Sequence, residues 1–237
     1  MPSFMKRSPR RVRASIWLLA SLLISAPAAA QLAPCSAPQA AAVASAATTV
    51  PIEVLNNHVY VRVCVNGHEL RFILDTGSGG SPIDMATARE MGIPLQGRGE
   101  ARGAGPGTAA TARIDKVNAT IPGTSVVVPL VAALDLSGVS KGEGLLIQGI
   151  LGYTFLSQYV VAIDYRSHEL RLYDPKTFRY DGAGARVPLD LRQNQPHIDA
   201  AIRLPDGESI KGFFLVDVGS GGALLFTKPF VDKHALR

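Results

Sequence analysis

The sequence predicts an all-β protein, because short apolar segments alternate with polar turns along most of the chain and helical stretches are brief. The clearest strand is "HVYVRVCV", in which the four valines of residues 59–65 fall on one face. Asn66-Gly67 follows, and because both residues tolerate positive φ the pair predicts a two-residue hairpin turn. The return strand "ELRFILD" ends at Asp75. A barrel or a sandwich of short strands is the expected architecture.

The elements after Asp75 follow from the same patterns. Residues 84–92, "DMATAREMG", predict a short helix that ends at Gly92. The glycine-rich stretch from Gly97 to Gly107 predicts a mobile loop. A break is expected at "SGVSKGEG", and one or two helical turns at "YTFLSQ". The remaining strand-like segments are residues 112–121, 125–134, 145–152, 159–165 and 169–174, of which the last two predict a hairpin.

The first 30 residues predict a signal peptide. A basic leader precedes the apolar run "SIWLLASLLIS", and Ala28 and Ala30 form a small-residue cleavage site. The run is shorter than the roughly 20 apolar residues of a membrane span, so we expect no stable span. Residues 31–50 are small and low in complexity, which predicts a flexible linker. The expected protein is exported, and is either periplasmic or secreted.

The net charge does not indicate a nucleic-acid partner. Five of the 24 cationic residues lie in the leader, which has no acidic residue, so the rest of the chain has 19 cationic residues against 19 acidic ones. Two cysteines remain, and either Cys35 and Cys64 form a disulfide or Cys64 packs on a strand and Cys35 is free. The five histidines are scattered and no metal-binding motif is present, so we expect neither a metal nor a cofactor.

An internal repeat is the most informative feature of the sequence. "VNGHELRFILDTGSGGSPI" has a second copy in "LPDGESIKGFFLVDVGSGGALLF". In each copy a turn with glycine leads to an apolar strand, then to an aspartate, and then to x-Gly-Ser-Gly-Gly. The aspartates are Asp75 and, 142 residues later, Asp217. One Asp-x-Gly turn is common in loops, whereas two copies that each end a buried strand indicate a functional pair.

Two aspartates brought close together suit amide hydrolysis. Because two neighbouring carboxylates repel each other when both are ionised, the pair keeps one proton over a wide pH range. The ionised member can then take a proton from water while the protonated member donates to a carbonyl oxygen. Gly77 and Gly219 would let the two loops approach closely. Ser78 and Ser220 could each donate a hydrogen bond to the nearby aspartate. The competing interpretation is that each aspartate only caps its own glycine turn.

At these residues the sequence resembles the pepsin-like and retropepsin-like aspartic proteases, specifically their secreted bacterial branch. The resemblance rests on "FILDTGS", on "GILG" at residues 149–152 and on "FLSQYVVAIDYRSHELRLYD". It implies one retropepsin-like β-barrel lobe over residues 51–180 and an incomplete second lobe over residues 187–237. In that family "ILG" runs beside the active-site loop.

The resemblance also implies roles for individual residues. Asp75 and Asp217 would be the catalytic pair of an aspartic endopeptidase acting on an extended polypeptide. Thr76 would hold the two loops together through its hydroxyl. The supporting residues of the two active-site loops would be Gly77, Ser78, Gly219 and Ser220. The candidates for a substrate-covering flap are Gly103, Gly105 and Gly107.

The sequence departs from the family pattern in two places. Val218 stands where the second loop would carry a threonine, so half of the polar bridge would be missing. The chain also ends 20 residues after Asp217, which leaves the second lobe a truncated repeat, and we expect a longer parent sequence. One alternative is therefore a catalytically inactive module that binds extended peptides. Another is a homodimer in which two copies of Asp75 meet.

Overall fold

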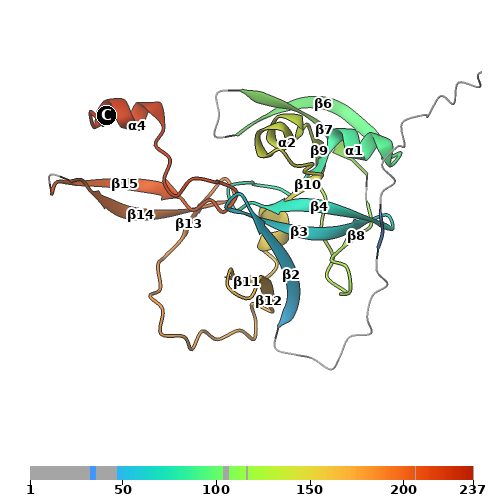
Figure 1. The fold of residues 1–237 in the computed structure, drawn as a ribbon, viewed down its shortest axis with the longest axis horizontal. Helices are drawn as coiled ribbons and strands as arrows, with labels where there is room; N and C mark the ends of the chain where they lie inside the picture. The colour runs from blue at the N-terminus through green and yellow to red at the C-terminus, as the bar shows by residue number, and fades with distance from the viewer. Residues whose placement is uncertain (1–32, 36–46, 104–106, 116, 206, 237) are drawn as a thin grey trace, which may run out of the picture. The chain divides into compact units, whose positions relative to one another are not determined.

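The computed structural model describes residues 33–35, 47–103, 107–115, 117–205 and 207–236, and shows a mainly β chain (Figure 1). By their contacts these residues belong to one unit, residues 32–237. The strands are β1 Ala33–Pro34, β2 Thr48–Leu55, β3 His58–Val65, β4 His68–Leu74, β5 Ile83–Asp84, β6 Leu95–Arg102, β7 Thr108–Ile114, β8 Ala119–Thr120, β9 Ala132–Leu134, β10 Gly149–Leu151, β11 Val160–Asp164, β12 Glu169–Tyr173, β13 Asp190–Arg192, β14 Gln195–Arg203 and β15 Ser209–Leu215. The helices are α1 Met85–Glu90, α2 Ser137–Glu143, α3 Tyr153–Leu156 and α4 Lys228–Lys233.

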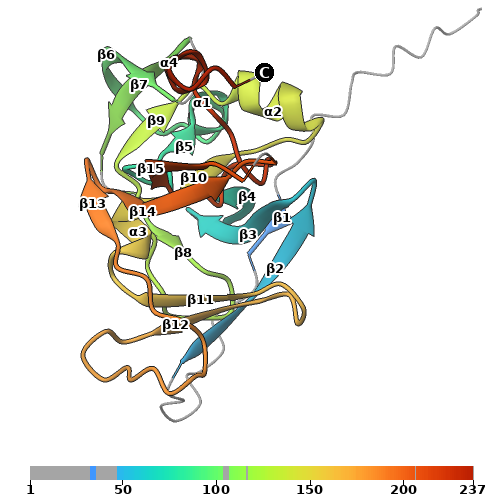
Figure 2. The same ribbon diagram turned by 90° about the vertical axis from the view of Figure 1, so that its left-hand side faces the viewer.

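The strands form two sheets. The larger follows the order β11-β12-β2-β3-β4-β10-β5-β9-β7-β6, with β1 added to β4 and β8 added to β3. The smaller is the antiparallel sheet β13-β14-β15, drawn in orange to red in Figure 2. Among the described residues no pairing joins β11 to β6, the two ends of the larger path, so closure into the predicted barrel is not found.

The β3–β4 hairpin forms as the sequence predicts. Asn66 and Gly67 have φ of 47° and 87°, the left-handed conformation that a two-residue turn with Asn-Gly adopts. The strands pair from Val65 opposite His68 back to Tyr60 opposite Ile73. The four alternating valines of β3 are all buried, which confirms the predicted apolar face.

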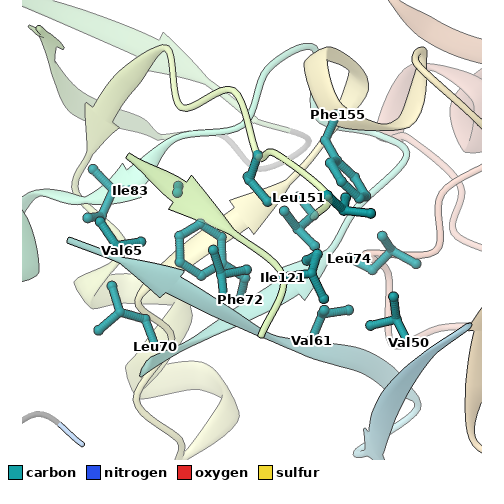
Figure 3. Packing of buried hydrophobic residues seen from close by; sticks show 14 of the residues in the cluster. Val50, Val61, Val65, Leu70, Phe72, Leu74, Ile83, Ile121, Leu151 and Phe155 are labelled. Atoms are coloured by element: carbon teal, nitrogen blue, oxygen red, sulfur yellow. The ribbon is translucent and has the colours of Figure 1, made fainter. Parts of the chain in front are cut away.

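The main core lies against β3 and β4. Leu70, Phe72 and Leu74 of β4 are fully buried and pack with Leu151 of β10 and Phe155 of α3 (Figure 3). Fully burying one such side chain contributes about 1.5–3 kcal/mol. The strand that ends at the first aspartate is therefore among the most firmly packed parts of the fold.

The parallel strand β10 fixes the end of β4. Leu151 of β10 lies opposite Leu74, and the next amide, Asp75 N, donates to Leu151 O at 3.0 Å. On its other side β10 pairs with β5. Since β10 lies between β4 and β5, the backbone at Asp75 is held by a neighbour far away in the sequence.

A disulfide joins Cys35 to Cys64, with 5.7 Å between their Cα atoms. It ties the segment of β1 to β3, and Cys35 N also donates to Gly67 O at 3.0 Å. Of the two alternatives that the sequence leaves open, the structure has the paired one.

Two sequence predictions of loop structure are wrong in part. Gly97 to Arg102 of the expected mobile loop belong to β6, because β7 supplies pairing partners and Gly97, with φ of 69°, takes up a bulge in the register. The expected break at residues 137–144 is helix α2, which Gly144 ends in the left-handed conformation at φ 63°.

The linker predicted for residues 31–50 is also wrong at both ends, because Ala33–Pro34 pair with β4 as strand β1. Thr48–Val50 belong to β2 and pair with β12, and the Val50 side chain is buried in the core. The predicted signal peptide, the rest of the linker at residues 36–46, and Gly105 lie outside the described residues. Within the described part of the chain, no helix has both the length and the apolar character to cross a membrane.

Candidate active site

The two aspartate loops meet within one chain. Asp75 directly follows β4, and Asp217 follows β15 with one residue between. In each loop the glycine two residues after the aspartate lies against the carboxylate of the other loop. A Cβ atom added to Gly77 would lie 2.8 Å from Asp217 Cγ, and one added to Gly219 would lie 2.4 Å from Asp75 Cγ. Real Cβ atoms do not approach so closely, so this contact requires glycine at both positions. The predicted pair is thereby brought together.

One hydroxyl bridges the loops. Thr76 Oγ1 donates to Val216 O at 2.6 Å and accepts a hydrogen bond from Val218 N at 3.0 Å. This is the role that the family resemblance implies for Thr76. Val218 has no hydroxyl that could make the equivalent hydrogen bonds from the Asp217 loop. The polar bridge therefore has only the half that the Asp75 loop supplies.

The environment of Asp75 favours its protonated form. Burial raises its pKa from 3.8 to about 7, and the charge of Asp217 and a hydrogen bond shared with it act in the same direction. The backbone amides of Gly77 and Ser78 oppose this rise. On the other loop, Gly219 N donates to Asp217 Oδ1 at 2.8 Å. One carboxyl can therefore hold a proton at a pH where the other accepts one.

The serines of the two loops do not contact the carboxylates as expected. Ser78 Oγ donates to Gly80 O at 2.9 Å, and Ser220 Oγ donates to Gly222 O at 3.5 Å. Each glycine turn brings the carbonyl two residues ahead within reach of the hydroxyl, a local bond typical of serine in turns. Ser78 and Ser220 therefore stabilise the turns, and backbone amides donate hydrogen bonds to the aspartates instead.

The "GILG" segment lies beside the Asp75 loop, as the resemblance implies. A Cβ atom added to Gly152 would be 2.1 Å from Gly80 O, so the two backbones are in direct contact. Tyr153 N donates to Ser78 O at 2.9 Å, and Gly152 N donates to Ser81 Oγ at 3.0 Å. The Asp75 loop is thus fixed from one side by β10 and the start of α3.

The flap candidates fall at the tip of a hairpin. Gly103 and Gly107 flank the part of the β6–β7 connection that lies outside the described residues, where Gly105 is found. A cavity of about 890 Å³ lies between this hairpin and α1, lined by Met85 and Arg89 of α1 and by residues of β6 and β7. Neither aspartate lines it, so the covering role of the hairpin stays a prediction.

Sequence reasoning missed residues that hold the two loops from outside. Gln195 Nε2 of β14 donates to Gly77 O, and Asn57 Nδ2 of the β2–β3 turn donates to Gly221 O at 3.3 Å. A polar pair between two strands, Asn56-Asn57 in one half and Gln193-Asn194 in the other, is the signal that could have located them. Within the described residues, no three His, Cys, Asp or Glu side chains are grouped so that they could hold a metal ion.

Comparison with known proteins points to one family. Residues 61–155 match the family model described as aspartyl protease, a stretch that contains the Asp75 loop and "GILG". Among solved structures, the chain is similar to a retropepsin-like aspartic protease from Rickettsia conorii, at 20% identity and a TM-score of 0.35 over 53% of this chain and 88% of that one. No curated protein matches the chain. By this match, residues 61–155 of the chain are similar to the aspartyl protease family.

Proposed function

We propose that the protein is an aspartic endopeptidase that hydrolyses peptide bonds with a water molecule activated by Asp75 and Asp217. The observation that carries the proposal is the crossing of the two loops, which sets Asp217 against Gly77 and Asp75 against Gly219. The pKa of Asp75, raised to about 7 by burial and by Asp217, supports the sharing of one proton by the pair. The match of residues 61–155 to the aspartyl protease family supports peptidase activity.

The mechanism follows from the protonation of the pair. The protonated carboxyl donates to the carbonyl oxygen of the scissile bond while the ionised one takes a proton from water, and the resulting hydroxide adds to the carbonyl carbon. The proton taken from water then passes to the leaving nitrogen as the C–N bond breaks, and a hydroxyl of the tetrahedral intermediate returns its proton to the other carboxylate as the carboxyl product forms. The pair again holds one proton. No covalent intermediate with the protein forms, and the burial of Asp75 strengthens the electrostatic interactions at the reacting atoms.

The proposed substrate is an extended polypeptide segment with apolar residues beside the cut. Exposed apolar side chains lie next to both aspartate loops: Val131 is 46% exposed, and its Cγ2 lies 3.2 Å from the position of a Cβ added to Gly80. Val216, adjacent to Asp217, is 39% exposed. The β6–β7 hairpin is the proposed cover for this segment.

The test is cleavage of an unstructured peptide mixture by the chain from Gln31, from acid to neutral pH. We expect Asp75→Asn and Asp217→Asn each to abolish the cuts, by about 10³-fold or more. If the site were completed by a second Asp75 in a homodimer, Asp217→Asn would leave the activity unchanged. The crossing of the Asp75 and Asp217 loops within one chain favours the intrachain pair.

A second candidate function is a module that binds extended peptides without cutting them. The half-missing polar bridge at Val218 favours it, because a loosely held pair of loops could keep the binding surface and lose the catalytic geometry. In that case a folded wild-type chain would bind peptides without turnover, and Asp75→Asn would change affinity alone.

We also propose that the protein works outside the cytoplasm, in the periplasm or as a secreted protein. The disulfide between Cys35 and Cys64 supports this, because such bonds persist in oxidising compartments. Fractionation of cells that produce the whole chain tests it. Recovery of the protein in the cytoplasm with both thiols reduced would contradict the proposal.

A further inference from the structure

The turn between β2 and β3 reaches across to the Asp217 loop. Its central residues, Asn56 and Asn57, have φ of 52° and 64°, as in a two-residue hairpin turn. Asn57 Nδ2 donates to Gly221 O at 3.3 Å. The ring of His58 lies beneath the same glycine: a Cβ atom added to Gly221 would be 2.9 Å from His58 Cε1. The turn therefore contacts the Asp217 loop by a hydrogen bond and by packing.

His58 cannot move away easily, because its other side is anchored. The residue is 6% exposed, and its Nδ1 lies 3.1 Å from Glu143 Oε2 at the end of α2, an ion-pair distance without hydrogen-bond geometry. Tyr60 OH donates to the same carboxylate at 3.5 Å, and Asn56 Nδ2 donates to Glu143 O at 3.2 Å. The turn is thus a rigid support fixed between α2 and the Asp217 loop.

The other half of the repeat has the mirrored contact. Gln193 and Asn194, in the turn between β13 and β14, have φ of 51° and 65°. A Cβ atom added to Gly79 would lie 3.2 Å from Gln193 O, and Gly79 and Gly221 are each the fourth residue after their aspartate. Gln195 also donates to the Asp75 loop. Each half therefore supports the aspartate loop of the other half through a tight turn.

We propose that the β2–β3 turn, residues 56–58, is a positioning element for Asp217. The turn holds the Asp217 loop at Gly221, and this support takes the place of the hydroxyl that Val218 lacks. This role rests on the proposed function, because correct placement of Asp217 matters for catalysis by the aspartate pair. It goes beyond the pair itself because residues 56–58 act through the loop backbone at Gly221.

The variant that tests this contact is Gly221→Ala. Its methyl group would collide with the buried His58 ring, so the Asp217 loop must shift. Gly222→Ala is the matched control, since its closest contact is Leu225 Cδ2 at 3.1 Å, on a side chain that is 70% exposed and free to move. Neither glycine has a positive φ, so alanine strains neither backbone.

The first measurement does not need peptidase activity. Carbon-13 NMR follows the titration of the Asp75 carboxyl, which is expected near pH 7 in the wild type. Moving Asp217 away weakens its charge effect and opens the site to water, so we expect Gly221→Ala to lower the midpoint by about one unit and Gly222→Ala to leave it unchanged. An unchanged midpoint in folded Gly221→Ala overturns the proposal.

The second measurement is peptide cleavage. We expect Gly221→Ala to lower kcat by about tenfold or more with KM within about twofold, because misplaced catalytic groups affect the reaction more than binding. Removing the collision with His58→Ala in the same chain should restore most of kcat and the midpoint. Val218→Thr, which supplies the missing hydroxyl, should restore part of both. If neither His58→Ala nor Val218→Thr restores kcat or the titration midpoint of the Gly221→Ala chain, the positioning role is contradicted.

A third pair of variants decides the matter if Gly221→Ala does not fold. Asn57→Gly keeps the turn conformation and removes the amide, and Asn66→Gly makes the same change in the β3–β4 turn far from Asp217. We expect a lower midpoint for Asn57→Gly alone, and equal midpoints would overturn the proposal. A wild-type chain that shows these NMR shifts but cuts no peptide would refute the proposed function while leaving the positioning role supported.

Discussion

Replacing Asp75 by asparagine should stabilise the protein at neutral pH. The fold raises the pKa of this carboxyl from 3.8 to about 7, chiefly through burial and then through Asp217. Below pH 3.8 the group is protonated in both the folded and the unfolded chain, so the raised pKa has no effect on stability. Between pH 3.8 and 7 the unfolded chain releases a proton that the folded chain keeps, so the free energy of unfolding falls as the pH rises.

The size of the effect follows from the shift. About three pKa units at 1.36 kcal/mol each give a loss on the order of 4 kcal/mol, complete above about pH 7. The asparagine side chain of the variant has no charge to desolvate and escapes this loss. Relative to the wild type, the Asp75→Asn variant should gain about 4 kcal/mol between about pH 3.5 and 8, or roughly 8–16 °C in melting temperature at about pH 8.

Urea unfolding of both proteins at several values of pH from about 3.5 to 8 measures this difference. Asp135→Asn is the control with the opposite sign, because hydrogen bonds from Ser137 lower the pKa of Asp135. The stability that Asp135 contributes is present above pH 3.8 and is lost as the pH falls through its lowered pKa. Parallel stability curves for the wild type and Asp75→Asn would refute the buried carboxylate pair.

Three further predictions concern the support of the site. Thr76→Val removes both hydrogen bonds of the bridge and should lower the free energy of unfolding by about 1–3 kcal/mol and reduce cleavage, whereas Thr76→Ser should retain both in urea unfolding and peptide assays. Gly152→Ala forces a methyl group into backbone atoms and should destabilise by about 3 kcal/mol or more, while Gly142→Ala, in an open site of α2, should be neutral or stabilising by thermal unfolding. Replacing both Cys35 and Cys64 by serine opens a loop of 29 residues and should cost about 3.5 kcal/mol, and a reducing agent should lower the wild type toward the same melting temperature.

The strand that leads to Asp75 could be predicted because the residues that specify it are adjacent in the sequence. An alternating valine strand, an Asn-Gly turn and an apolar return strand leave little freedom in where the aspartate falls. The repeat extended this to Asp217, and the glycines after each aspartate indicated a close approach of the two loops. The half-missing bridge followed from one residue, Val218.

Contacts set by distant neighbours could not be predicted in the same way. Glycine-rich residues 97–102 are a strand only because β7 lies beside them. The hydroxyl of Ser78 has a carbonyl and a carboxylate within one turn, and the sequence does not show which it contacts. The support of Gly221 by residues 56–58 depends on the approach of two halves of the fold, for which no single stretch of sequence carries a signal.

The separation of the two aspartates along the chain has a consequence for when catalysis can begin. The hydroxyl bridge joins residues 142 positions apart, so it can form only after a long loop has closed, a slow step in folding. A growing or partly folded chain has each aspartate alone, with an ordinary acidity and no partner to share a proton. We therefore expect the proposed peptidase activity to appear only when folding is complete.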